Sequence, residues 1–302
     1  MSKIILVADS TCDLGPELIK EYDVRVIPMH INMELDGEMK SFTDVGWMPE
    51  SERPTDDGYM TSEQMLQICE QKDIVPTTAA LNLGEFVDAF TPLVADGETH
   101  VICVTISSAL SVTHAAAVMA KAEVANGQNI HVIDSRTLSA GSGLLLRKAH
   151  VMREAGKSAE EIVTELEKIK MGSKVSFILE TAEWLHKGGR ISGFKLAMAN
   201  MLNIKPCIEV DTATGKMGPG KKYKGQFGRA LTEYVEAKLV GTNYDDDCLF
   251  ITHAGADQEV IDLVKAKVQE VAKFKKIHVT RAGMTISCHC GRNTLGLLFL
   301  TK

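Results

Sequence analysis

The chain has 302 residues, 45% of them hydrophobic and 24% charged, and a formal net charge of -7. This length predicts two domains of ordinary globular composition, and the acidic balance argues against a nucleic-acid-binding protein, which would need a basic surface for phosphates. No apolar run reaches the roughly 18 residues of a membrane-spanning helix, so no integral membrane segment is expected.

Cysteine usage and the first residues favour a cytoplasmic protein. The seven cysteines form no C-x-x-C pair, which favours reduced thiols over a disulfide framework. The first apolar run, Ile4–Ala8, is too short for a secretory signal peptide.

Strands and helices alternate through the first half of the chain. Such alternation predicts an α/β domain with a parallel sheet and crossover helices. The expected strands are Ile4–Ala8, Val24–Met29, Val101–Thr105 and Ile130–Ile133, and the expected helices start at Pro16 or span Ser62–Glu70, Leu83–Phe90, Leu110–Ala125 and Ser139–Ala155.

Two features between these elements affect the domain organisation. Residues Asp36–Thr61 are rich in Gly, Pro and Asp, and we expect them to form a long loop with little regular structure. Gly156 ends a helix, and Ser158 with Glu161 forms a capping box for the next. We therefore predict domains at 1–157 and 158–302.

The second half of the chain predicts an α+β domain with a mixed or antiparallel sheet. The turn Asp211–Gly215 indicates a hairpin. The expected strands are Val175–Leu179, Ile204–Val210, Leu249–Thr252, Ile277–Thr280 and Leu295–Leu300.

Three strands of the first half run directly into hydroxyl-rich turns. The turns are Asp9-Ser10-Thr11, Ser107-Ser108 and Asp134-Ser135. In an open α/β sheet, ligands bind beyond the carboxyl ends of the strands, where N–H groups and hydroxyls can hold an anion. For each single turn, simple capping of the next helix is the alternative. Ser107-Ser108, with Ser111 one turn further on, offers more hydroxyls than capping needs.

Other motifs argue against nucleotide and metal sites. Gly215-x4-Gly220-Lys221 begins like a phosphate-binding loop, but Lys222 stands where Ser or Thr would meet magnesium. If Cys288-His289-Cys290 is extended, the thiols and the imidazole face opposite sides, so no shared metal is expected. The chain has no G-x-S-x-G elbow and no complete dinucleotide fingerprint, and no cofactor is predicted.

Six segments in the same order along the chain resemble the DegV family of fatty-acid-binding proteins. Each segment is short, but together they run from end to end. They are Asp9–Leu14, Ile106–Ser111, Ile133–Thr137 with Gly141-Ser142-Gly143, Lys187–Ser192, Ile204–Pro206, and His289-Cys290-Gly291 with Thr294-Leu295-Gly296.

This resemblance implies a carrier, not an enzyme. Such a protein encloses a long-chain fatty acid in a tunnel between two α/β domains and presents the carboxylate to a separate fatty acid kinase. The kinase makes an acyl phosphate that enters phospholipid synthesis. The fatty acid would be the only bound small molecule.

The resemblance also implies roles for particular residues. Thr78 matches a threonine that binds the carboxylate together with a serine, here Ser107 or Ser108. A basic residue and a histidine assist, and these match Lys224 and His289; Arg190, in the Lys187–Ser192 motif, is a further head-group or partner contact. The chain departs from the family at two of the implied contact positions. The amide of Asn82 replaces an expected hydroxyl, and Lys224 replaces an arginine, so it lacks the two-point hydrogen bonding of a guanidinium group to phosphate.

Two other functions fit the same residues. Ser108 or Ser111 could act as a nucleophile with His289 as its base, in an acyl-ester hydrolase or acyltransferase. A protein of the same fold could also bind another small carboxylate in place of a fatty acid.

Overall fold

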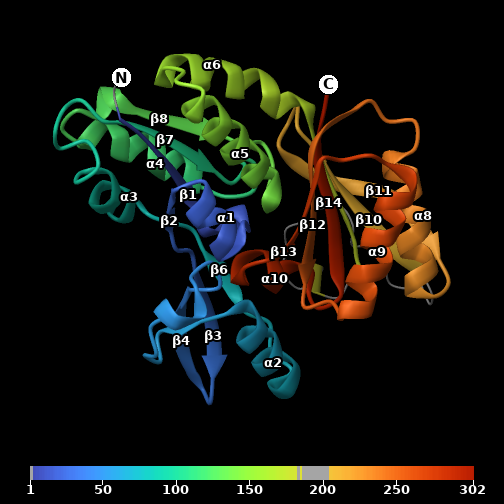
Figure 1. Ribbon diagram of the computed structural model, residues 1–302. Coiled ribbons are helices and arrows are strands. Elements are labelled where there is room, and N and C mark those ends of the chain that lie inside the picture. The colour runs from blue at the N-terminus through green and yellow to red at the C-terminus, as the bar shows by residue number, and fades with distance from the viewer. Residues whose placement is uncertain (1–2, 182–183, 186–203) are drawn as a thin grey trace.

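The structure, a computed structural model, describes residues 3–181, 184–185 and 204–302. Three β-sheets form the frame of the molecule (Figure 1). Sheet A is parallel, with strand order β2-β1-β7-β8, as the alternating pattern predicts. Its strands are β1 (Ile4–Asp9), β2 (Val24–Ile27), β7 (His100–Thr105) and β8 (Ile130–Asp134).

Helices cover both faces of sheet A, which explains why its strands are apolar on both sides. The helices α3 (Leu83–Phe90) and α4 (Thr113–Glu123) pack on one face. The helices α1 (Gly15–Glu21), α5 (Ala140–Glu154) and α6 (Ala159–Ile169) pack on the other. The predicted capping box of Ser158 and Glu161 begins α6.

Sheet B corrects the expectation of a long loop over residues 36–61. Its strands are β5 (Tyr59–Met60), β4 (Glu38–Asp44), β3 (His30–Leu35) and β6 (Thr77–Ala79), in that order. Asp36 and Gly37 both have positive φ and join β3 to β4 in a two-residue hairpin. The helix α2 (Ser62–Lys72) packs against this sheet.

Sheet C is mixed, with the order β11-β10-β9-β14-β12-β13, as predicted for the second half. Its strands are β9 (Ser173–Ile178), β10 (Ile204–Asp211), β11 (Lys216–Lys224), β12 (Tyr244–Ala254), β13 (Lys276–Arg281) and β14 (Thr294–Thr301). The predicted hairpin turn joins β10 to β11. The helices α8 (Phe227–Leu239) and α9 (Gln258–Val271) cover one face, and the other packs against α5 (Figure 1).

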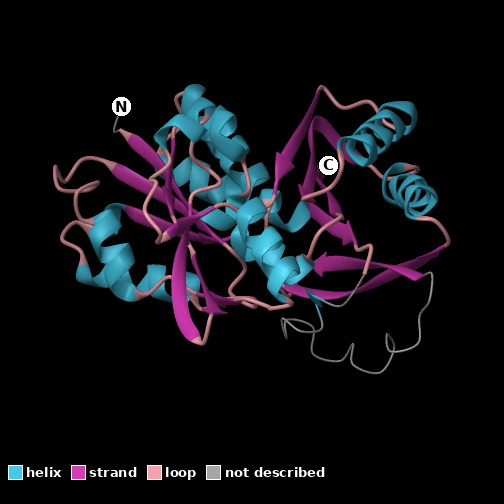
Figure 2. Ribbon diagram, turned by 90° about the horizontal axis from the view of Figure 1, so that it is seen from below, coloured by secondary structure: helices cyan, strands magenta, loops and turns pink. Residues whose placement is uncertain are grey.

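Sheets A and C lie at opposite ends of the molecule when it is seen from below (Figure 2). The helix α6 contacts β7 and β8 of sheet A, and sheet C begins only at Ser173. A domain boundary drawn from packing would therefore fall later than 157/158. The boundary at 157/158 stays a prediction. Within the described ranges, no helix combines the length and the apolar character needed to cross a membrane.

Candidate functional site

A cavity of about 490 Å³ lies where the three sheets meet. It opens beyond the carboxyl ends of β2, β7 and β8, the edge at which the sequence predicts a ligand. Most of its lining is apolar. The described lining residues are Met29, Thr78, Ala80, Ile106, Ser108, Ala109, Leu110, Ser111, Val112, Leu138, Leu185, Met217, Thr285, Ile286, His289 and Cys290. Its size is that of a site for a small organic ligand.

One wall of the cavity is the short helix α10 (Met284–Cys290). The argument against a shared metal at Cys288-His289-Cys290 applied only if the segment was extended, and the structure shows a helix there instead. Its first turn is fixed by distant carboxylates. The backbone N–H of Gly283 donates to Asp13 at 2.8 Å, and that of Met284 donates to Asp44 at 2.8 Å.

These two carboxyl groups are buried deeply enough to change their acidity. Burial raises the pKa of Asp13 well above its ordinary value, although bonds from the Ser139 hydroxyl and the Gly283 N–H work against it. Burial also raises the pKa of Asp44 to about 6, against the bonds from the backbone of Gly46 and Met284. Both groups therefore take up protons more readily in the fold than in water.

Three polar side chains meet on the cavity wall. The Thr78 hydroxyl on β6 lies 3.2 Å from Nε2 of His289. Thr285 stands one turn before His289 on the same face of α10, because residues four apart on a helix are neighbours. The Thr285 side chain is 6% exposed, and its hydroxyl has no hydrogen-bond partner among the described residues.

Thr285 is a cavity-lining residue that the sequence analysis did not identify. A buried hydroxyl without a partner costs free energy, so an unpaired hydroxyl on a residue that lines a cavity favours a polar ligand group at this wall. Its only sequence signal is the spacing of four from His289, which becomes informative once the segment is known to be helical.

The serine turn contributes differently from what the sequence predicts. Ser108 lines the cavity, but its hydroxyl donates to Asp134 at 2.6 Å. Ser107 is fully buried and does not line the cavity; its hydroxyl donates to the carbonyl of Gly215 at 2.8 Å, in the β10–β11 turn. Ser111 lines the cavity and bonds to the Thr113 hydroxyl at 2.8 Å.

The other predicted contact residues lie away from the described cavity lining. Asn82 is exposed and caps α3, accepting the N–H of Glu85 at 3.1 Å. Lys224 ends β11 and is exposed. Arg190 and the whole Lys187–Ser192 motif lie outside the described residues. Their predicted roles are not tested by this geometry.

The remaining two hydroxyl turns are used within the fold. Asp9 accepts the backbone N–H groups of Thr11 at 3.0 Å and Ile106 at 2.8 Å, and the Ser10 hydroxyl accepts the N–H of Met29 at 2.9 Å. Ser135 donates to the carbonyl of Thr137 at 3.2 Å. Asp9 caps the short 3-10 turn Ser10–Cys12, as the capping alternative expects, whereas Ser135 bonds within its own loop and does not cap α5.

Comparison with known proteins decides the family. The model of the DegV family of uncharacterised proteins matches residues 3–302, almost the whole sequence. The chain belongs to the DegV family. Among curated relatives, a DegV domain-containing protein from Clostridium acetobutylicum is 29% identical over 303 residues and covers 100% of both chains.

Solved DegV structures share the fold. A DegV lipid-binding protein from Thermotoga maritima superposes with a TM-score of 0.82 at 24% identity, covering 99% of this chain and 98% of that one. A DegV family protein from Eubacterium eligens, loaded with heptadecanoic acid, gives 0.80 at 23% identity and covers 99% and 100%. The predicted fold and family are thus confirmed.

Proposed function

We propose that this DegV protein binds a long-chain fatty acid, with the tail in the cavity and the carboxylate at Thr78, Thr285 and His289. The observation that carries the proposal is Thr285, which lines a mostly apolar cavity and whose buried hydroxyl lacks a hydrogen-bond partner among the described residues. The Eubacterium eligens relative, which was loaded with heptadecanoic acid, supports the same ligand class.

Apolar burial would supply the affinity. About 14 methylenes at roughly 0.8 kcal/mol each give on the order of 11 kcal/mol before the cost of ordering the chain is subtracted. A second, separate void of about 30 Å³ lies between α10 and sheet C, and its lining shares Leu138, Ile286 and Cys290 with that of the cavity.

The polar trio would orient the head group. Hydroxyl and imidazole N–H donors form short, charge-assisted bonds to a carboxylate. Thr285 would gain its hydrogen-bond partner, and Thr78 would turn its hydroxyl from His289 toward the ligand. Ser108 remains a proposed further donor, but its hydroxyl would first have to leave Asp134.

We further propose that the bound carboxylate is presented to a separate kinase. The kinase would transfer the γ-phosphoryl group of ATP to a carboxylate oxygen, leaving ADP and an acyl phosphate. The exposed rim at Ser108–Val112 supports access to the head group, since Val112 is 69% exposed beside the cavity. In this scheme Lys224 and Arg190 contact the head group or the partner.

The hydrolase alternative has less support. A serine nucleophile needs a base within hydrogen-bond reach. The hydroxyls of Ser108 and Ser111 are bonded to Asp134 and Thr113, not to His289. A small polar carboxylate also fits poorly, because it would leave the apolar lining of the cavity uncovered.

Displacement of a fluorescent fatty acid tests the binding proposal. Delipidated protein should release the probe to palmitate or oleate, but far less readily to hexadecanol, which has the palmitate tail without the carboxylate. Failure of palmitate to displace or bind would overturn the proposal. Turnover of p-nitrophenyl esters that is lost in Ser108→Ala or Ser111→Ala would instead favour the hydrolase.

A further inference from the structure

Two histidines and a glutamate gather at the end of sheet A remote from the cavity. His100 is the first residue of β7, and His131 is the second residue of β8. The register pairs Ile102 with His131, so His100 and His131 lie diagonally on one face of the sheet. Glu160 belongs to the first turn of α6, which covers that face.

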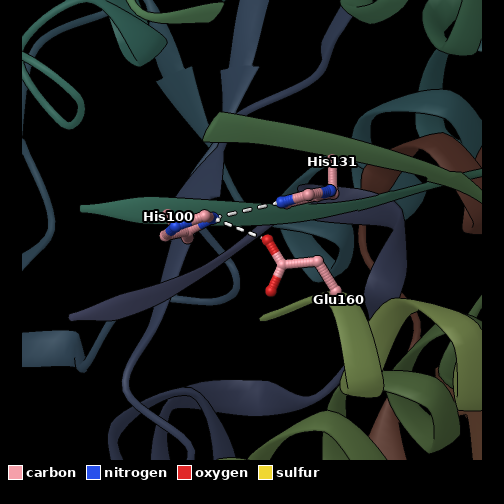
Figure 3. Close-up of side chains that lie close together, drawn as sticks. All are labelled: His100, His131 and Glu160. Atoms are coloured by element: carbon pink, nitrogen blue, oxygen red, sulfur yellow. Dashed lines mark hydrogen bonds and ion pairs between the residues drawn. The ribbon is translucent and has the colours of Figure 1, made fainter. Parts of the chain in front are cut away.

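The geometry of the three side chains is that of a metal ligand set (Figure 3). Nδ1 of His100 lies 3.3 Å from Nε2 of His131 and 3.8 Å from Oε1 of Glu160. The three ligand atoms all lie within 4.8 Å of one another. Two nitrogens bound to tetrahedral zinc at about 2.1 Å would be about 3.4 Å apart, close to the 3.3 Å between Nδ1 of His100 and Nε2 of His131.

The chemistry of the site also suits a metal. Two imidazoles at this distance cannot both carry a proton on the facing nitrogens. Each imidazole offers a ring nitrogen and Glu160 offers a carboxylate oxygen, and zinc accepts both types of ligand atom. The Glu160 side chain is 65% exposed, so it is free to move toward a shared ion.

We propose that His100, His131 and Glu160 bind one divalent transition-metal ion, with Zn²⁺ as the best geometric match and water in the fourth position. The ion would tie β7 and β8 to α6. Since α6 leads through residues 170–172 directly into sheet C, the site would stabilise the connection between sheets A and C. The site is separate from the fatty-acid cavity and does not depend on the proposed function.

Titration of the tag-free protein with ZnCl₂ against a chromophoric zinc chelator tests this inference. The wild type should bind one equivalent, and CoCl₂ should give the visible absorption of a four-coordinate site. His100→Gln or His131→Gln should weaken zinc binding at least about tenfold, and Glu160→Gln somewhat less, because each removes one ligand. Glu165→Gln, which removes a carboxylate from the same helix, is the matched control and should bind zinc like the wild type.

Zinc should also raise the thermal midpoint of the wild type but not that of the His100→Gln/His131→Gln double variant. Circular dichroism checks that each variant is folded. Equal zinc affinity in the double variant, or the absence of zinc binding by folded wild-type protein, would overturn the inference. Palmitate binding should be unchanged in the double variant.

Discussion

The substitution Thr285→Val tests whether the Thr285 hydroxyl binds the ligand or stabilises the fold. Valine has nearly the shape of threonine and a similar helix propensity, so the substitution removes little besides the hydroxyl. In the ligand-free protein this hydroxyl is buried without a described partner, a state that costs about 1–3 kcal/mol. We therefore expect the variant to be as stable as the wild type or slightly more stable.

The same substitution should weaken fatty-acid binding. A hydrogen bond to a charged group contributes about 1.5–3 kcal/mol, which corresponds to a roughly 10- to 100-fold increase in the dissociation constant of palmitate. Binding of hexadecanol should change less, because the alcohol lacks the charge. Urea unfolding of delipidated protein and displacement of a fluorescent fatty acid measure the two effects.

Thr137→Val provides the matched control. The Thr137 hydroxyl is also buried without a described partner, but Thr137 does not line the cavity. Its removal should leave palmitate binding unchanged. If Thr285→Val binds palmitate normally and loses stability, the hydroxyl is structural and the reasoning is refuted.

Three other perturbations test the account. Asp44→Asn tests the buried carboxylates: because the pKa of Asp44 is raised to about 6 in the fold, its contribution to stability is present below about pH 4 and is lost as the pH rises through about 6. The difference in unfolding free energy between wild type and variant should therefore fall by on the order of 3 kcal/mol from pH 4 to 7 in urea titrations, and a flat difference would contradict this. Ile286→Trp fills the inner part of the cavity and should abolish palmitate binding while sparing octanoate in the same displacement assay; equal loss of both would point to misfolding, not a shortened tunnel. Ser108→Ala should weaken palmitate binding by less than about threefold, because the hydroxyl proton is donated to Asp134; calorimetry that finds a loss as large as in Thr285→Val would place the carboxylate at the serine turn.

The sequence predicts elements with a strong hydrophobic period well. The helix Leu83–Phe90 has the predicted bounds, and the strands of sheet A differ from prediction mainly at their ends. These segments are recognisable because their own residues supply the core-facing pattern and the caps.

The missed elements depend on partners elsewhere in the chain. The strand β4 is largely exposed and carries little apolar alternation, although Asp36-Gly37 is a hairpin signal that was available. The strand β11 contains two glycines, a proline and four lysines, and only an edge position tolerates such a strand.

The site was predicted in part for the same reason. Ser108 follows β7 at the carboxyl edge of the parallel sheet and lines the cavity, where the rule for such sheets places a ligand. Thr78 lies on β6, an antiparallel strand of sheet B, and it and His289 were expected from the family resemblance. The helix α10 looks like a strand locally, because Thr, Ile and Cys fill it, and it starts where Asp13 and Asp44 accept its N–H groups. Without that helix, Thr285 cannot be placed beside His289.

Mass spectrometry of the purified protein tests the central claim most directly. Protein taken from its producing cells without detergent should carry one fatty acid per chain, visible as a mass shift under native conditions and identified after denaturing extraction. Ile286→Trp, purified in parallel, should carry none. A wild-type protein that yields no fatty acid, and that takes up neither palmitate nor oleate when they are added, would contradict the account.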